Sequence, residues 1–159
     1  MEQVSIYEAT GGGTAFLALA AAHHTRCLAD PVLEHPFSHG VEPDHVERLA
    51  AYWAEVLGGP STYSATYGGH SEVLRMHAGN DMEADLGERF VACFVAAADD
   101  AGLPEEPELR AALRGYMEWS TRAMYAYNPR DAVVPSEMAM PRWGWAGLEQ
   151  SPVIEERGG

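Results

Sequence analysis

The chain has 159 residues, enough for one domain with a hydrophobic core and too few to expect two. Its 10 basic and 24 acidic residues give a formal net charge of −14, which repels nucleic-acid phosphates and anionic lipid surfaces alike. The apolar run from Ala15 to Ala22 is too short to span a membrane, and no cationic lead-in of a signal peptide precedes it. We therefore expect a cytoplasmic protein with neither nucleic-acid nor membrane partners.

The composition favours helices, because alanine, leucine and methionine are plentiful and runs of β-branched residues are scarce. The first helix is predicted from Thr14 to Ala29, before Pro31. Its inward face should carry Phe16, Leu19, Ala20, His23 or His24, Cys27 and Leu28. Neither Cys27 nor Cys93 forms a Cys-x-x-Cys pair, so two buried thiols are favoured over the alternative of a disulfide.

A second long helix is predicted from Asp44 to Leu57, where Gly58, Gly59 and Pro60 end it. Its inward residues should be Leu49, Tyr52, Trp53 and Val56. Residues 61–69 show no lasting period and predict a loop that can contain a turn of helix. A short helix should follow over residues 70–77.

Two further helices are predicted from about Met82 to Ala101 and, after Pro104, from about Glu106 to Tyr127. The inward faces should carry Leu86, Phe90, Cys93, Phe94 and Ala97 in the first and Leu109, Leu113, Met117 and Met124 in the second. Residues 1–128 are thus expected to form an all-α domain. Residues 129–159, with their prolines, glycines and tryptophans, predict an irregular C-terminal extension packed partly on it.

Three of the seven histidines are expected to face the interior from three different helices. His24 lies on the inward face of the first helix, His45 shares a helix face with Leu49, and His77 ends a short apolar helix. Because no His-x-x-x-His or Glu-x-x-His pair occurs in a suitable helix, a zinc hydrolase or di-iron site lacks its usual ligands. A haem site needs only one axial histidine, an apolar pocket and a chosen polarity on the opposite side.

A series of short motifs runs through this helical pattern in a fixed order, and Gly-Gly-Pro-x-x-Tyr leading to two histidines seven residues apart is the most specific of them. The residues concerned are Tyr7, Gly11, Gly12, Phe16, Asp30, Val32, Leu33, Phe37, Arg48, Leu49, Gly58, Gly59, Pro60, Thr62, Tyr63, Gly69, His70, Leu74, Arg75, Met76, His77 and Ala78. In these motifs the chain resembles the truncated haemoglobins, most closely their group II, over residues 5–127.

The resemblance implies a truncated globin, a two-over-two helical sandwich around haem b. It assigns His77 as the proximal iron ligand, with Met76 beside it, and Phe37 as an aromatic contact of the haem. The implied ligand pocket consists of His24, His45, Leu49 and Phe90. Donors to the haem propionates are implied at Arg48, Tyr63, His70 and Arg75, and from the residues alone His70, like His35 and His39, is expected at the surface or on the propionate side.

The chain departs from the group II pattern on the distal side of the haem. His24 stands where the family usually has a tyrosine, and Phe90 stands where it usually has a tryptophan. The network that stabilises bound oxygen in the family is therefore replaced here by imidazoles, and His23 is the alternative if His24 turns away.

Three functions remain open on the sequence. The first is a haem protein that binds oxygen or another diatomic gas at ferrous iron, for oxygen transport, nitric oxide dioxygenation or peroxidase-type turnover. A reductase that donates electrons would then be a partner, and the protein would be a monomer or homodimer. The second is a non-catalytic haem-based gas sensor or storage protein, and the third is a helical domain without haem. Fold alone does not choose among them.

Overall fold

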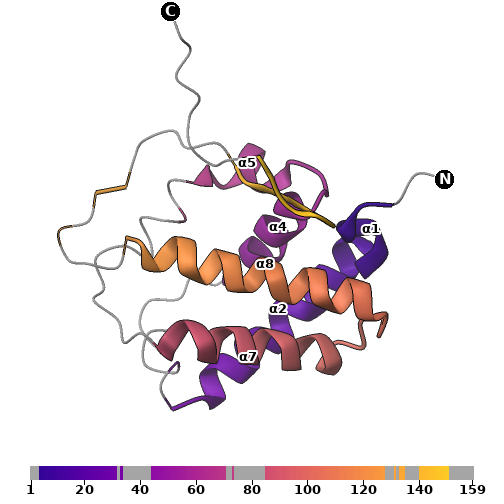
Figure 1. The fold of residues 1–159 in the computed structure, drawn as a ribbon, viewed down its shortest axis with the longest axis horizontal. Coiled ribbons are helices and arrows are strands. Elements are labelled where there is room, and N and C mark those ends of the chain that lie inside the picture. The colour runs from indigo at the N-terminus through magenta and orange to yellow at the C-terminus, as the bar shows by residue number, and fades with distance from the viewer. Residues whose placement is uncertain are drawn as a thin grey trace, which may run out of the picture.

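The computed structural model describes residues 4–31, 33, 44–70, 73, 85–127, 131, 133–134 and 140–150. These residues form six α-helices and one antiparallel sheet of two strands (Figure 1). The elements are α1 (Ile6–Thr10), α2 (Gly12–Ala29), α4 (His45–Val56), α5 (Thr62–Thr66), α7 (Asp85–Asp100), α8 (Pro107–Tyr125), β1 (Arg142–Gly144) and β2 (Gly147–Gln150). The all-α prediction is confirmed. Within the described ranges, no helix is long and apolar enough to cross a membrane.

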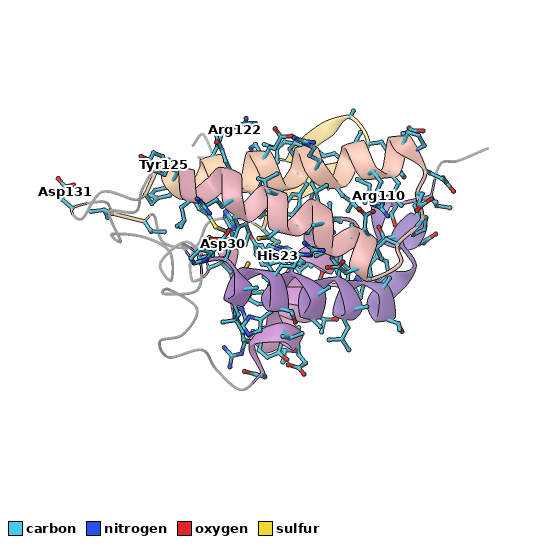
Figure 2. All side chains as sticks on the ribbon, turned by 90° about the horizontal axis from the view of Figure 1, so that it is seen from below. His23, Asp30, Arg110, Arg122, Tyr125 and Asp131 are labelled. Atoms are coloured by element: carbon cyan, nitrogen blue, oxygen red, sulfur yellow. The ribbon has the colours of Figure 1, made fainter. Side chains whose placement is uncertain are left out.

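The four long helices form two layers. α2 packs against α4 in one layer and α7 packs against α8 in the other, while α2 also packs against α7 and so joins the layers (Figures 1 and 2). Each of these four helices begins and ends within three residues of its predicted bounds. This pairing is the two-over-two sandwich expected from the sequence.

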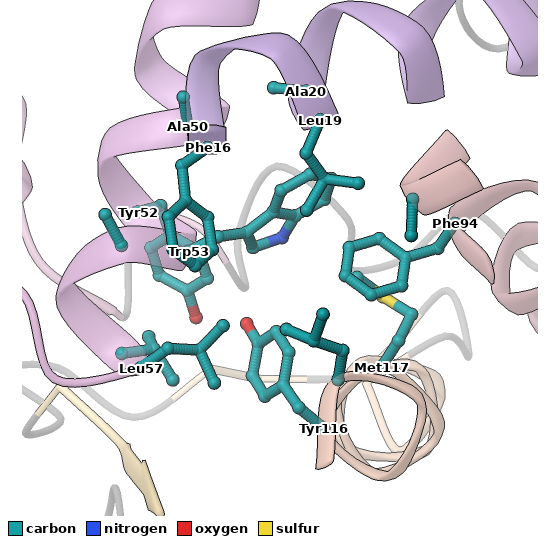
Figure 3. Packing of buried hydrophobic residues seen from close by; sticks show 14 of the residues in the cluster. Phe16, Leu19, Ala20, Ala50, Tyr52, Trp53, Leu57, Phe94, Tyr116 and Met117 are labelled. Atoms are coloured by element: carbon teal, nitrogen blue, oxygen red, sulfur yellow. The ribbon is translucent and has the colours of Figure 1, made fainter. Parts of the chain in front are cut away.

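The core lies where the inward faces of these four helices meet (Figure 3). Fully buried side chains reach it from every one of them, namely Phe16, Leu19, Trp53, Phe94, Leu113, Tyr116 and Met117. The predicted inward faces are therefore largely confirmed. One assignment is wrong, because Leu28 is 40% exposed. It follows Cys27 by one residue, which on a helix rotates its side chain by about 100° away from the buried face.

The short helix α1 was not predicted from the sequence. Ser5 caps it, because the Ser5 hydroxyl accepts a hydrogen bond of 3.1 Å from the backbone N–H of Glu8. Gly11, with a φ of 123°, then ends α1 and lets the chain turn into α2. The pattern Ser-x-x-Glu at residues 5–8 is a known helix-start signal, so this helix had a signal in the sequence.

The loop after α4 is held to that helix by a buried carboxylate. Glu55 is 1% exposed and accepts hydrogen bonds from the backbone N–H and the hydroxyl of Ser64. Ser64 lies in the first turn of α5, where backbone N–H groups favour a negative charge. Glu55 thereby fixes α5, the helical turn that the sequence allowed within residues 61–69.

The C-terminal extension is not irregular throughout, which corrects the prediction for residues 142–150. There β1 and β2 form a hairpin with Trp143 opposite Leu148, and Gly147 adopts a φ of 107° at its turn. The Trp143 ring packs 5.6 Å from that of Trp119 on α8, and its indole N–H donates to the Ala112 carbonyl. Contact with α8 therefore gives order to a segment whose own sequence favours a loop.

Candidate functional site

Helices α2 and α4 bring His24 and His45 together. The centroids of their rings lie 5.2 Å apart with a 53° angle between the ring planes, and both side chains are half-buried. His45 is the first residue of α4, and Leu49, also half-buried, follows one helical turn later on the same face. The two imidazoles that the sequence predicted for one pocket thus lie side by side.

His23, one residue before His24, lies in a different environment. It is fully buried between α2 and α7 (Figure 2), and three aromatic rings meet it nearly edge-on. Its ring centroid is 4.4 Å from that of Phe90, 5.4 Å from that of Trp53 and 5.9 Å from that of Phe94. The sequence offered His23 only as a replacement for His24, whereas both histidines face the interior.

The surroundings of His23 keep its imidazole neutral. The pKa of His23 is lowered from 6.5 to about 3, mainly by burial and to a smaller extent by the nearby His24 and His45, while a hydrogen bond with the Cys93 backbone opposes the shift. Its Nε2 also lies 3.3 Å from the sulfur of Cys27. At neutral pH His23 is therefore uncharged.

The two cysteines lie near His23 and are both free thiols. Burial raises the pKa of Cys27, and the neighbouring Cys93 raises it further. The pKa of Cys93 is also raised, mainly by burial. Because the thiolate is the reactive and metal-binding form, neither residue is suited to nucleophilic chemistry at neutral pH.

A second polar cluster lies further along α4. The Tyr52 hydroxyl is 2.8 Å from Nδ1 of His70, and both side chains are buried. Burial lowers the pKa of His70 to about 4. Tyr63, predicted as a propionate donor, packs its ring 5.3 Å from that of Tyr52. A surface position for His70 is therefore wrong, and Tyr52 is a partner that sequence reasoning missed.

Arg48 lies on α4 between the two clusters. Its Nε is 2.9 Å from a carboxylate oxygen of Asp44, and its guanidinium lies 4.9 Å from the centroid of the Tyr67 ring. These contacts hold the side chain over α5. A role for Arg48 toward haem propionates stays a prediction.

The remaining predicted site residues, Phe37, Arg75, Met76 and His77, lie outside the described residues. The predicted site residues that the structure describes fall into two groups: the His24–His45 pair with Leu49 and, from α7, Phe90, and a second group of Arg48, Tyr63 and His70. In the described ranges no group of three or more His, Cys, Asp or Glu side chains could hold a metal ion.

Comparison with known proteins shows the family to which this chain belongs. A family model described as bacterial-like globin matches residues 5–125. Among solved structures, the haemoglobin of the thermophilic phototrophic bacterium Chloroflexus aurantiacus is 30% identical, with 77% of this chain and 98% of that chain covered and a TM-score of 0.65. The thermostable haemoglobin of the actinobacterium Thermobifida fusca is also 30% identical, with 84% and 100% covered and a TM-score of 0.65.

A group II 2-on-2 haemoglobin from the plant pathogen Agrobacterium tumefaciens shares the fold, at 24% identity and a TM-score of 0.65 over 78% of this chain and 95% of that one. The chain belongs to the bacterial-like globins, and its structural neighbours are truncated haemoglobins that include group II. The globins are haem-iron proteins that bind diatomic gases, and that description extends to this chain.

The described residues fit a haem on the distal side. Leu49 and Phe90 are apolar but only partly buried, although they lie on faces that pack against the core. A flat apolar macrocycle between α4 and α7 would cover such surface. The adjacent imidazoles supply donors and acceptors at the edge of that surface, where a small polar ligand needs them.

Proposed function

We propose that this protein binds haem b through His77 and holds a diatomic gas on the opposite side, beside His45 and His24. The observation that carries the proposal is the pair of half-buried imidazoles, 5.2 Å apart, at the edge of an apolar wall. Haem b supplies ferrous iron that binds the gas. Phe37 and Met76 would pack around the macrocycle, and Arg48, Tyr63, His70 and Arg75 are proposed on its propionate side.

The distal histidines determine how tightly a gas ligand is held. A neutral imidazole donates one N–H, and a diatomic ligand that carries partial negative charge accepts it. Because a bound haem would cover this half-buried surface and exclude water from it, that hydrogen bond would be worth more than in solution. His45 begins α4 one turn before Leu49, so we assign it the direct contact and assign His24 the role of orienting it.

Substitution of the proximal histidine tests the haem assignment. His77→Ala should abolish stable haem retention, because we expect no other histidine at the proximal position. The measurement is the ratio of Soret to protein absorbance after gel filtration, in the ferric, ferrous and carbon monoxide forms. His39→Ala, in a histidine without a proposed role, is the matched control. An unchanged spectrum for His77→Ala would overturn the globin site.

Turnover separates the two functions that the site permits. A nitric oxide dioxygenase or peroxidase consumes its substrate steadily when a reductase or chemical donor returns the haem to its starting oxidation state after each turnover, whereas a sensor or storage protein completes one binding event. We propose the turnover function, in the cytoplasm, with a reductase as partner. Steady consumption of nitric oxide or peroxide by the purified haem protein with an electron donor supports it, and a single stoichiometric reaction supports the sensor.

A further inference from the structure

A buried hydrogen bond joins α4 to the segment that leads toward the proposed proximal ligand. The Tyr52 hydroxyl lies 2.8 Å from Nδ1 of His70, and the two rings are stacked with 9° between their planes. Tyr52 is 3% exposed and His70 is 2% exposed. This pair stands apart from the distal histidines, and the function proposed so far places His70 on the propionate side of the haem but gives Tyr52 no role.

The protonation of the pair is fixed by its burial. The pKa of the Tyr52 phenol is raised well above 10, mainly by burial, so the phenol keeps its proton at neutral pH. The pKa of His70 is lowered to about 4 for the same reason, so the imidazole is neutral. The phenol therefore donates and Nδ1 accepts, which leaves the imidazole proton on Nε2.

We propose that Tyr52 is a redox-active tyrosine that gives one electron to the haem after the haem has reacted with a peroxide, with His70 as the acceptor of its phenolic proton. The inference rests on the proposed haem function and adds a second redox centre to it. An oxidised phenol is a far stronger acid than an imidazolium, so it gives up its proton to a nearby base even where burial lowers the pKa of that base to about 4. His70 provides a base for that proton at hydrogen-bonding distance.

The step balances in electrons and atoms. Reduction of a peroxide to water, or to water and an alcohol, takes two electrons in all and two protons from the solvent, and the haem that had reacted with it would be two electrons short. One electron then passes from Tyr52 to the haem, the O–H bond of Tyr52 breaks, and an N–H bond forms at Nδ1 of His70. Tyr52 becomes a neutral tyrosyl radical and His70 an imidazolium. An external one-electron reductant such as ascorbate supplies the second electron to the haem, another molecule of it supplies one electron to the tyrosyl radical, and His70 returns the proton to Tyr52.

Tyr52 lies near the proposed haem contact in one direction and near further aromatic rings in the other, so electrons can reach it and leave it. Tyr52 follows Leu49, the proposed haem contact, by three residues, which is about 4.5 Å along the helix axis. In the other direction the Tyr52 ring meets the ring of Tyr63 at 5.3 Å, and Tyr63 meets the half-buried Tyr67 at 5.5 Å. Aromatic rings thus connect the buried pair with a residue that solvent reaches.

Tyr116 offers a matched comparison within the same core. Its hydroxyl lies near that of Tyr52 (Figure 3), and the residue is 0% exposed, with its pKa also raised by burial. Among the described residues, its hydroxyl has no imidazole beside it as a base: Ser120, which lowers its pKa, offers only a hydroxyl, a far weaker base than an imidazole. If burial and position alone made a tyrosine redox-active, Tyr116 would serve as well as Tyr52.

The test is electron paramagnetic resonance of the haem-loaded protein, frozen at a series of times after mixing with hydrogen peroxide. The wild type should give a radical signal that narrows when the protein carries ring-deuterated tyrosine. Tyr52→Phe should lose that signal, and Tyr116→Phe should keep it. His70→Gln retains an acceptor for the Tyr52 hydroxyl but no base, so its radical should form about 100-fold more slowly, the usual loss for a removed proton acceptor.

The carbon monoxide spectrum of each variant separates the failure of this inference from the failure of the proposed function. Absence of a Soret band from the wild type would overturn the haem function and this inference with it. A normal carbon monoxide spectrum together with no tyrosyl signal in the wild type would overturn the inference alone. So would a signal of unchanged yield in Tyr52→Phe, or of unchanged rate in His70→Gln.

Discussion

The two ends of α4 differ in how deeply their side chains are buried. At the N-terminal end His45, Arg48 and Leu49 are half-buried, whereas at the C-terminal end Tyr52, Trp53 and Val56 are at most 3% exposed. The first end carries polar groups beside an apolar wall, and the second closes the core against α2, α7 and α8. One helix thus joins an end suited to ligands and an end that supplies stability, and substitutions at the two ends should have different consequences.

The largest effect is expected from the closed end. Trp53→Ala removes a ring that is 2% exposed and that packs against both His23 and Phe94. The free energy of unfolding should fall by about 3–5 kcal/mol, as for other large-to-small changes in a core. Urea unfolding of the haem-loaded protein measures it. Leu49→Ala at the open end is the comparison, and an equal loss there would contradict the distinction between the two ends.

The second effect concerns ligand binding at the open end. His45→Leu should speed oxygen dissociation by roughly five-fold to a hundred-fold, because it removes a buried hydrogen bond of about 1–3 kcal/mol. If the unliganded protein shows a six-coordinate low-spin spectrum, this variant should also remove it, since an imidazole can offer its lone pair to iron. Stopped-flow rates for wild type, His45→Leu, His24→Leu and the double variant measure the contributions.

The double variant shows whether the two distal histidines act together. If His24 orients His45, the effect of the pair should be smaller than the sum of the single effects in free energy. Dissociation rates within two-fold of wild type in all three variants would show that neither histidine touches the ligand.

The third effect is a pH dependence of the stability. It arises at His23, which lies on α2 and contacts Trp53 on α4. Above pH 6.5 this imidazole is neutral in both the folded and the unfolded chain. As the pH falls from 6.5 toward about 3, the unfolded chain takes up a proton that the folded chain does not, so the free energy of unfolding decreases. At pH 5 the loss from His23 should be about 2 kcal/mol, given 1.4 kcal/mol for each pH unit.

His23→Phe isolates this contribution, because phenylalanine suits the surrounding ring of aromatic side chains and does not titrate. The variant should lose less stability than wild type between pH 7 and pH 5, as measured by urea unfolding at both values. Some dependence should remain, since His70 also has a lowered pKa. Identical pH dependences in variant and wild type would show that His23 is not buried in its neutral form.

Apolar spacing along a helix predicted the long helices and the inward positions of His24 and His45, and the family resemblance implied that the two share one pocket. The sequence missed the partner of His70, since Tyr52 lies 18 residues away and only the packing of the chain brings them together. It also did not place His23, because one helix face can hold either of two adjacent histidines and the neighbouring helix decides. The hairpin at residues 142–150 was missed for the same reason, as its order depends on contact with α8.

The smallest effect on ligand binding is expected from the C-terminal extension, which we propose to be separate from the globin domain of residues 1–128. A chain that ends at residue 129 loses Trp143, which packs on α8, and Trp145, whose indole N–H donates to the Val4 carbonyl at 2.7 Å. These contacts lie beside Trp119 and the N-terminus and not at the histidine pair. The truncated protein should therefore unfold at a lower temperature but retain haem in the same ratio as the full chain.

The Soret-to-protein absorbance ratio and a thermal melt of the two proteins measure these quantities separately. Trp143→Ala in the full chain is the matched control and should lower the melting temperature in the same direction. Loss of haem from the truncated protein at a temperature where it remains folded would instead make the extension part of the pocket.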